Sequence, residues 1–471
     1  MPFAQTAGER ARAALADVRH EPYWLAHPER PRARDPLEGS TTADLVVVGA
    51  GLSGLWTAVR AKQRRPDLDV VVLEGGRIAG SASGRNGGFV AASITHGHLN
   101  GIERWPDEFA QLHALGVANL RGIEQTIADY DIDCGYRRTG ELNVVTEQYQ
   151  LPHAHGHVEQ VQSYGIDLAF WDSEQTRTAV DSPLYLGAIV DPEVGIVDPA
   201  RLSWGLARVA EQLGVRIHEH SGVEALQPSG TGMTVRTFGG RAEARMVALT
   251  TAAHAPLLKR LTAFVVPVFD HVVMTAPLPD DVLAQIGWSG RQGIGDSGNQ
   301  FHYYRMTEDN RILFGGYDAV YEAGERPGSH LERDDALTAR LIQHLHDTFP
   351  PVSRVPIDFA WAGAIDTCSR FSAFWGSAYK GRVAYVVGFT GLGVGASRFG
   401  ADVVLDKLLG EDTERTRLRM VRSKPLPFPP EPARQLAIDM TRRSLAKADE
   451  REGYRDLWLR TLDRLGLGFD S

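Results

Sequence analysis

Residues 44–54 read Asp-Leu-Val-Val-Val-Gly-Ala-Gly-Leu-Ser-Gly. The apolar run is typical of a strand buried on both faces of a parallel sheet, and the glycine-rich turn after it opens a helix. In such a turn Gly49 permits the tight bend, Gly51 lets the backbone approach a pyrophosphate, and Gly54 allows the helix to pack closely on the strand. Because the helix N-terminus then faces the phosphates, the stretch predicts a dinucleotide-binding domain.

The sequence after the turn supports this prediction. Residues 55–64 are compatible with a helix that ends before Pro66, and residues 69–73 form a second apolar run that ends in Glu74. Glu74 follows Gly54 by roughly the 20 residues at which an acid accepts hydrogen bonds from ribose hydroxyls. A carboxylate there also repels a 2′-phosphate, which argues against NADP. We therefore favour a binding turn over a purely structural one.

Composition places the chain among ordinary soluble globular proteins. Its 471 residues allow two or three domains, and 43% of them are hydrophobic, which is enough for a substantial core. The 50 basic and 59 acidic residues give a formal net charge of −9, and no long basic run suggests a nucleic acid or an anionic membrane as partner. The only cysteines, Cys134 and Cys368, exclude a disulfide framework. Without a secretory signal or a membrane-spanning apolar run, we expect a cytoplasmic protein.

The pattern along the chain predicts a nucleotide domain that is built from both chain ends and interrupted by a second domain. Apolar runs separated by helical segments are typical of the first, and alternating strands are typical of the second. The ranges that we predict are 1–43 for a lead-in, 44–100, 191–260 and 361–410 for the nucleotide domain, 101–190 and 261–360 for the mixed and antiparallel parts of the second domain, and 411–471 for a proline strap and helical tail.

Three separated elements agree with one family. They are the Gly49 turn with Glu74, the loop Ser83-Gly84-Arg85-Asn86-Gly87-Gly88, and the turn Gly388-Phe389-Thr390-Gly391-Leu392-Gly393-Val394-Gly395. Together they resemble the FAD-dependent D-amino-acid oxidase superfamily over roughly residues 20–410. The loop and the preceding Pro22-Tyr23-Trp24 look most like the gamma-glutamylputrescine oxidase branch, which is related to sarcosine and glycine oxidases.

The resemblance implies an α/β plus α+β fold, in which a Rossmann-like FAD-binding domain of the glutathione-reductase type carries an inserted antiparallel-sheet substrate domain. FAD would lie with its diphosphate on the first turn, its ribose on Glu74 and its ring beside the loop and the closing turn. The cofactor-binding residues that we predict are Gly49, Gly51, Ser53, Gly54, Glu74, Ser83, Gly84, Arg85, Asn86, Gly87, Gly88, Val223, Thr390, Gly391, Leu392, Gly393 and Val394.

Candidates for substrate contact come from the predicted antiparallel sheet. Residues 301–305 and 311–314 flank a turn and predict a hairpin, whose alternation separates Tyr303 and Arg305 from His302 and Tyr304. Arg305 is able to clamp a carboxylate in bidentate fashion. The residues for which we predict a catalytic role are His302, Tyr304, Arg305 and Trp361, the last as an aromatic wall for an amine. Alternating aromatic residues are also typical of a core, so that alternative stays open.

Four further residues are weaker candidates. His96 and His98 follow the flavin loop and could accept a proton, although hydrogen-bonded loop histidines are as compatible with the sequence. Tyr317 and Asp318 follow a pair of glycines after the hairpin. Since no carboxylate cluster accompanies the histidines, we predict no metal.

The sequence departs from related sarcosine oxidases at two positions. Those enzymes use a lysine near the flavin for the reaction with oxygen, and alignment of residues 312–317 places Phe314 there. They also attach flavin through a cysteine, but the residues around Cys368 do not match their local pattern, so we favour non-covalent FAD.

The resemblance implies an oxidase of a primary or secondary amine, such as a polyamine derivative or a small amino acid. Hydride would pass from the carbon beside a neutral amine to flavin N5, water would hydrolyse the imine, and O₂ would reoxidise the flavin to give hydrogen peroxide. The alternatives are a dehydrogenase that uses another electron acceptor, a flavin-binding partner protein without turnover and, last, a nicotinamide enzyme. The tail is expected to pack either on its own core or on a second subunit of a homo-oligomer.

Overall fold

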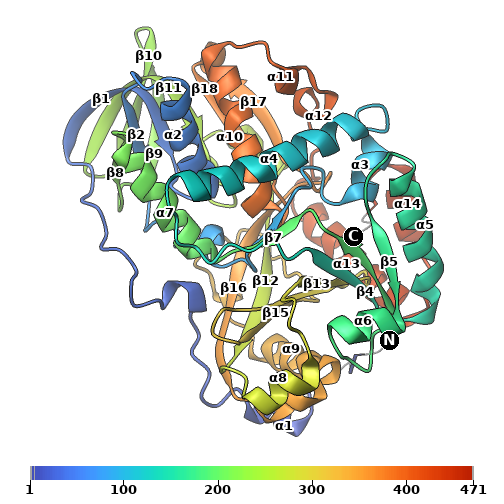
Figure 1. The fold of residues 1–471 in the computed structure, drawn as a ribbon. Coiled ribbons are helices and arrows are strands. Elements are labelled where there is room, and N and C mark those ends of the chain that lie inside the picture. The colour runs from blue at the N-terminus through green and yellow to red at the C-terminus, as the bar shows by residue number, and fades with distance from the viewer. Residues whose placement is uncertain (1–2, 5, 469–471) are drawn as a thin grey trace.

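A parallel sheet forms the first half of the computed structural model, which describes residues 3–4 and 6–468 (Figure 1). Its central strand β1 pairs in parallel with β11 and β2, and the last four residues of β1 are buried, as the apolar run predicts. In spatial order the strands are β17 (Phe374–Ala378), β18 (Val383–Val387), β11 (Gly240–Leu249), β1 (Gly39–Val48), β2 (Val70–Leu73) and β8 (Arg216–His218), and β10 (Gly232–Thr237) joins β11 to β9 (Val223–Ser229). Both chain ends therefore supply strands to this sheet.

Three helices cover one face of the first sheet. They are α2 (Leu52–Arg64), α7 (Pro199–Gln212) and α10 (Gly393–Leu409), and α4 (Phe109–Asp129) crosses α10 (Figure 1). Their apolar sides share one core with the buried residues of β1 and β2. The strands β9 and β10 extend the sheet on its other side, where a separate core forms.

The second sheet is largely antiparallel. In spatial order its strands are β16 (Ile357–Thr367), β12 (Val266–Thr275), β15 (Ile312–Gly316), β14 (His302–Met306), β13 (Gly293–Asp296), β4 (Glu141–Val145), β6 (Gly187–Asp191) and β5 (Ala169–Asp172). The pairing of Tyr304 with Phe314 confirms the predicted hairpin. The sequence predicts that residues 361–410 belong to the nucleotide domain. Strand β16 runs past residue 361, however, so residues 361–367 belong to the second sheet.

Shorter elements surround the two sheets. A small two-stranded sheet of β3 (Phe89–Ala91) and β7 (Val194–Ile196) lies between them, and α9 (Asp335–Thr348) packs on the far face of the second sheet. The other helices are α1 (Glu9–Ala13), α3 (His98–Arg104), α5 (Leu151–Gln162), α6 (Ser173–Ala179), α8 (Asp280–Ile286), α11 (Glu414–Arg417), α12 (Arg419–Arg422), α13 (Ala433–Glu450) and α14 (Leu457–Arg464).

The C-terminal tail returns to the second sheet of its own chain. Figure 1 shows α13 and α14 beside β4 and α5. Asp449 on α13 accepts hydrogen bonds from the backbone N–H groups of Asn299 (3.0 Å) and Gln300 (2.9 Å), and Arg442 donates to Asp318 at 2.7 Å. Of the two arrangements that the sequence left open for this tail, the structure therefore has the one in which it packs on its own core.

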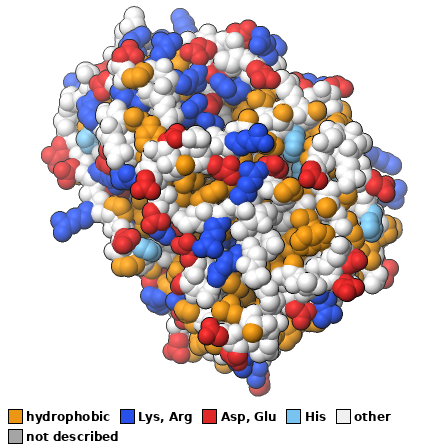
Figure 2. Space-filling model, in the orientation of Figure 1, with side chains coloured by type: hydrophobic (Ala, Val, Ile, Leu, Met, Phe, Trp, Pro, Cys, Tyr) orange, Lys and Arg blue, Asp and Glu red, His pale blue; other side chains and the backbone are white. Residues whose placement is uncertain are grey.

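The outer surface is mixed in character. Figure 2 shows Lys and Arg side chains interspersed with Asp and Glu side chains over one face. Among the described residues, none of the helices combines the length and the apolar character that a membrane crossing needs.

Asp406 on α10 joins the two chain ends within the first half of the molecule. Its buried carboxylate accepts hydrogen bonds from Arg64 on α2 at 2.6 Å, from Arg415 at 2.9 and 3.0 Å and from Thr413 at 2.7 Å. Burial alone would raise the pKa of Asp406, but the hydrogen bonds from Arg415 and Thr413 and the two arginine charges hold this pKa below its usual range. The carboxylate therefore stabilises the folded state in its ionised form.

Replacing Asp406 with Ala leaves Arg415 without a carboxylate partner and Arg64 with only Glu411 and the more distant Asp402, so we expect the free energy of unfolding to fall by about 3 kcal/mol near neutral pH. Because the pKa of Asp406 is lower in the folded chain, its contribution is present above the unfolded-state pKa and is lost as the pH falls through the folded-state pKa. Urea denaturation of both proteins at about pH 7 and about pH 3 measures this difference. A difference that stays constant with pH would contradict the expectation.

Candidate active site

The turn between β1 and α2 presents backbone to a large cavity. Gly49 has φ = +101°, and a Cβ on it would lie 2.9 Å from the carbonyl oxygen of Thr250. A Cβ on Gly51 would lie 2.8 Å from Oγ of Ser83. A Cβ on Gly54 would lie 1.9 Å from the carbonyl oxygen of Gly49, so this residue packs α2 on the strand. The turn is an open backbone cradle at a helix N-terminus, the place where phosphate groups bind.

Glu74 follows β2 beside this cradle. One carboxylate oxygen accepts a hydrogen bond from the backbone N–H of Ala50 at 2.7 Å, and the other accepts one from Gly76 at 2.8 Å. Each oxygen has room for a second hydrogen bond. Since the side chain also borders the cavity, it is placed to accept two ribose hydroxyls while it holds the turn.

The loop Ser83–Gly88 is held from both sides. The indole N–H of Trp24 donates to the carbonyl oxygen of Asn86 at 2.9 Å, and that of Trp361 donates to the carbonyl oxygen of Arg85 at 2.8 Å. Oγ of Ser83 accepts a hydrogen bond from the first backbone N–H of α2 at 2.9 Å. The lead-in, the second sheet and the nucleotide-type turn thus fix one loop.

The closing turn brings the N-terminus of α10 to the same place. The backbone N–H of Gly388 donates to the carboxylate of Asp366 at 2.6 Å, and Thr390 and Gly391 have φ values of +49° and +92°. Burial raises the pKa of Asp366 to about 6, although the backbone N–H groups of Gly388 and Phe389 lower it. Residues 390–394 border the cavity, so the positive end of the α10 dipole faces it.

These elements enclose one cavity of about 1290 Å³. Sites for a single small molecule are commonly about 300–1,000 Å³, so the volume accommodates a cofactor together with a substrate. Every residue predicted to bind cofactor borders it except Gly54 and Gly84. A Cβ on Gly84 would lie 2.2 Å from the carbonyl oxygen of Ala79, so both exceptions serve close backbone packing instead.

The inner face of the second sheet forms the floor of the cavity. Tyr303 on β14 donates a hydrogen bond to the half-buried carboxylate of Asp270 on β12. A Cβ on Gly87 would lie 2.8 Å from the Tyr303 ring, so this ring supports the Ser83–Gly88 loop. Burial raises the pKa of Asp270 to about 6 and that of Tyr303 well above its usual range. The phenol therefore stays protonated, and its oxygen is able to accept one hydrogen bond from a ligand.

Two of the residues predicted to be catalytic lie on the wrong face of the same strand. His302 is bonded to Asp296 (2.6 Å) and to His344 (2.9 Å), and Tyr304 to Tyr185 (2.9 Å). Both are buried in the core under α9, and neither borders the cavity. Strand alternation sends every second residue to the face that α9 covers, so the prediction of substrate contact by His302 and Tyr304 is wrong.

Arg305 and Trp361 act on the loop and do not border the cavity. Arg305 lies on the inner face, but its guanidinium donates to the carbonyl oxygens of Val197 and, at 3.5 Å, Gly87. Both bonds are made by Nη1, and the guanidinium does not reach the cavity, where the sequence suggested a carboxylate clamp. Trp361 uses its N–H on Arg85, as described above, so both residues position the loop rather than a substrate.

The weaker candidates divide between the cavity and its surroundings. His96, Tyr317 and Asp318 border the cavity, whereas His98 lies outside it, with Nε2 3.9 Å from Asp191. Burial and the charge of Arg104 lower the pKa of His96 to about 4, so the imidazole is neutral near pH 7. Asp318 is paired with Arg442 of the tail.

Two parts of the cavity wall were missed by sequence reasoning. Glu141 on β4 is one, because a lone acid at the start of a strand has no distinguishing pattern. The tail is the other: residues 427–429, α13 and α14 line the cavity, including Ile438, Leu445 and Trp458. The spacing of leucines in α14 indicates an amphipathic helix, but no sequence signal says what it covers.

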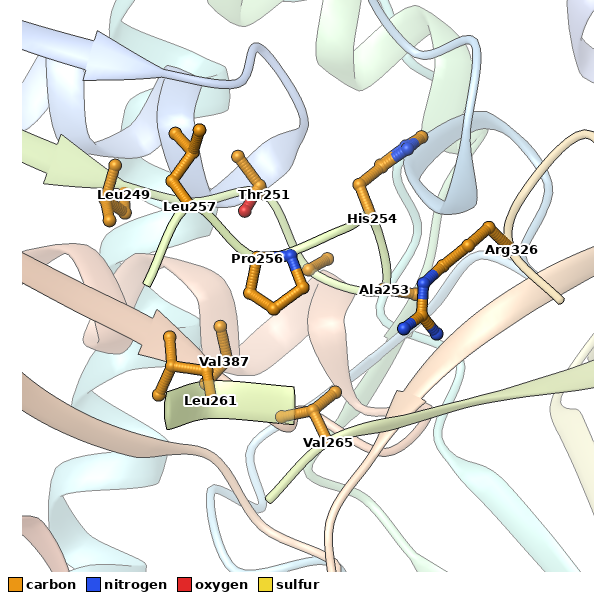
Figure 3. Close-up of a pocket in the computed structure, with 11 residues that line it drawn as sticks. Leu249, Thr251, Ala253, His254, Pro256, Leu257, Leu261, Val265, Arg326 and Val387 are labelled. Atoms are coloured by element: carbon orange, nitrogen blue, oxygen red, sulfur yellow. The ribbon is translucent and has the colours of Figure 1, made fainter. Parts of the chain in front are cut away.

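A second, much smaller pocket lies beside the main cavity (Figure 3). Its walls are largely apolar, among them Leu249, Leu257, Leu261 and Val387. The volume of about 20 Å³ is room for little more than one water molecule, so this pocket does not accommodate a substrate.

Cys368 also borders the main cavity. Its Sγ lies 3.2 Å from the carbonyl oxygen of Ser372 and 3.5 Å from that of Gly388. Burial raises the pKa of this thiol, and a protonated thiol that donates to backbone carbonyl groups is a poor nucleophile.

Comparison with known proteins gives one consistent result. A family model described as FAD dependent oxidoreductase matches residues 44–406. The gamma-glutamylputrescine oxidoreductase of Escherichia coli (strain K12) is 31% identical, with 83% of this chain and 89% of that protein covered. Sarcosine oxidase subunit beta of an Arthrobacter species is 26% identical, with 70% and 78% covered.

Solved structures share the fold. Glycine oxidase from Geobacillus kaustophilus superposes with a TM-score of 0.66 at 19% identity, covering 79% of this chain and 96% of that one. L-Proline dehydrogenase from P. horikoshii gives a TM-score of 0.65 at 16% identity, covering 80% and 96%. These likenesses support the α/β plus antiparallel-sheet architecture.

The residues around the cavity fit FAD. A side chain at Gly49 or Gly51 would press on Thr250 or Ser83 and so disturb the backbone cradle, and the free acceptor sites of Glu74 suit a ribose. The N-terminus of α10 supplies a positive end for the electron-accepting ring of a flavin.

Replacing Gly49 with Ala places a methyl group against the carbonyl oxygen of Thr250 and a non-glycine residue at φ = +101°. We expect FAD affinity to fall by roughly tenfold or more, because the cradle must shift. The absorbance ratio of the flavin band at roughly 450 nm to the protein band reports cofactor content.

Gly214→Ala is the matched control. Gly214 also has positive φ, +88°, but a Cβ there meets nothing within 4 Å and lies away from the cavity. Equal loss of FAD in both variants would show that backbone strain, and not the cradle, causes the effect.

Proposed function

The chain belongs to the family of FAD-dependent oxidoreductases, and we propose that it oxidises a primary or secondary amine, such as a polyamine derivative or a small amino acid. The similarity to gamma-glutamylputrescine oxidoreductase, which extends over most of both chains, supports this substrate class. The observation that supports it best is that the cofactor cradle opens onto a floor bearing Tyr303, Asp270 and Glu141. A tyrosine and two acids suit a nitrogen that donates hydrogen bonds or carries positive charge.

The proposed reaction divides the work between cofactor and protein. When bound, FAD supplies the acceptor for the hydride that leaves the carbon beside the nitrogen, and it hands two electrons to O₂, which becomes hydrogen peroxide. The amine becomes an imine, and water converts this into a carbonyl compound and ammonia or a smaller amine. The oxygen of Tyr303, fixed by its bond to Asp270, accepts an N–H of the neutral amine and sets its orientation.

One observation supports an electron acceptor other than O₂. Among the described residues that border the cavity there is no lysine, and Phe314 packs on the α9 side of the sheet. The lysine that promotes the reaction with oxygen in related sarcosine oxidases therefore has no counterpart among the described residues that border the cavity. A dehydrogenase that passes its electrons to a quinone or a carrier protein is the second candidate.

Anaerobic titration of the FAD-loaded protein with amines tests the proposal. Bleaching of the flavin band by a diamine, sarcosine or glycine is the expected result and ranks the substrates. Admission of air then separates the two candidates, because an oxidase regains its colour with stoichiometric peroxide, whereas a dehydrogenase stays bleached until an artificial acceptor is added. A protein whose flavin no amine reduces would fit a binding partner without turnover.

Tyr303→Phe removes one hydrogen bond to the substrate amine. We expect the second-order rate constant of flavin reduction to fall roughly fivefold, because losing one hydrogen bond costs about 1 kcal/mol of binding free energy. Tyr304→Phe is the control, because it removes the same group from the α9 side of the strand, away from the cavity. Stopped-flow reduction of both variants makes the comparison, and an equal loss in the two would exclude a substrate contact by Tyr303.

We propose that Cys368 forms no covalent bond with FAD. Precipitation of the protein with acid should release the yellow cofactor into the supernatant, because the buried thiol is protonated and bonded to backbone carbonyl groups. A yellow pellet that becomes colourless in Cys368→Ala would show a covalent link instead.

A further inference from the structure

Glu141 stands on the floor of the cavity, on the same sheet as Tyr303. Its strand β4 is adjacent to β13, which pairs with β14, and Gly295 on β13 lies opposite Tyr303. Oε1 of Glu141 lies 3.6 Å from the position of a Cβ on Gly295. Since Gly295 pairs with Tyr303, the Glu141 carboxyl group reaches over β13 on the face of the sheet that bears Tyr303. The glycine between them leaves the floor open.

This carboxyl group has no partner. Among the described residues, none forms a hydrogen bond or an ion pair with the Glu141 side chain, which is half-buried and borders the cavity. Burial, together with the nearby charge of Asp191, raises the pKa of Glu141 to about 8. A carboxyl group with this pKa is largely protonated near pH 7, and a cation beside it would favour its ionised form, so the group is suited to a positively charged ligand.

The arginines around the cavity are already paired with acids. The imidazole of His96 is uncharged near pH 7, and no lysine borders the cavity within the described part of the chain. Each arginine that borders the cavity has an acid partner: Arg77 with Glu219 (3.7 Å), Arg85 with Glu332 (2.8 Å), Arg442 with Asp318 (2.7 Å) and Arg455 with Asp463 (2.6 Å). His254 also borders the cavity, where its Nε2 lies 3.2 Å from Oγ of Ser81. The described walls therefore present an unpaired acid, but no lysine and no arginine without an acid partner.

The remaining walls suit an aliphatic chain. The tail contributes Ile438, Leu445 and Trp458 to the cavity. The ring of Phe89 covers Gly293, which pairs with Glu141 in the β4–β13 ladder, and a Cβ on Gly293 would lie 2.4 Å from that ring. An aromatic ring beside a carboxylate is a favourable place for an ammonium group.

We propose that Glu141 binds the ammonium group at the non-reacting end of a substrate with two basic nitrogen atoms. This proposal rests on the proposed amine oxidation and narrows its substrate class to diamines and polyamine derivatives. Tyr303 marks the end beside the loop, where the neutral nitrogen reacts, and Glu141 marks the other end. The methylene chain between the two nitrogens lies along the apolar walls.

The test compares Glu141→Gln with the intact protein, both loaded with FAD. The Kd values of 1,4-diaminobutane and of butylamine are measured anaerobically by calorimetry on protein whose FAD has been reduced beforehand with dithionite, so that the ligand is not oxidised. Reduction of the oxidised flavin by each amine is recorded in a separate experiment. We expect the intact protein to prefer the diamine, and the variant to lose roughly 10- to 100-fold in affinity for the diamine with little change for butylamine. Glu174→Gln, an exposed residue on α6, is the matched control and should change neither value.

Glu141→Asp distinguishes a contact with the substrate from a general effect of the substitution on the structure. It keeps the charge and withdraws it by one methylene, so the preferred diamine should become about one methylene longer. An intact protein that binds butylamine as tightly as the diamine, or an equal loss for both ligands in Glu141→Gln, would overturn the proposal. Binding is read without turnover, so diamine selectivity in a protein whose flavin no amine reduces would contradict the proposed function alone.

Discussion

Close packing of backbone at the β1–α2 turn is the constraint on which the rest of the structure depends. A side chain at Gly49 would press on Thr250 and one at Gly51 on Ser83, and Gly54 lets α2 begin directly against the strand. Glu74, at the end of β2, accepts a hydrogen bond from the backbone of Ala50 in this turn. The loop after it is then bonded to α2 through Ser83.

The same constraint explains why distant segments meet at one loop. The Ser83–Gly88 loop has little regular structure of its own, so its shape depends on groups that reach it from elsewhere. Trp24 reaches it from the lead-in, Trp361 from β16 and Arg305 from β14. Two of the residues that the sequence suggested for substrate binding are therefore needed to hold the cofactor side of the cavity.

Local signals were enough to predict the cofactor half. A strand, a turn and a helix with glycines at fixed spacing are determined by backbone conformation, so residues 44–54 and 388–395 could be identified without a structure. The hairpin of β14 and β15 was predictable for the same reason. The sequence did not reveal which face of the hairpin borders the cavity. That depends on α9, which comes later in the chain and packs over His302 and Tyr304. Glu141 lacks any local signature, since its significance arises from Gly295, Phe89 and the tail around it.

Cofactor chemistry and substrate choice are thus encoded in different ways. The family model ends at residue 406, before the strap, α13 and α14, yet these segments form much of the apolar wall of the cavity. A flavin needs the same backbone contacts whatever amine is oxidised, and those contacts leave recognisable glycine patterns. A substrate is distinguished by isolated charges and by the shape of a wall, and these can change while the cofactor turn stays the same. The tail and the floor of the second sheet are therefore where this chain is expected to differ most from relatives that share its FAD site.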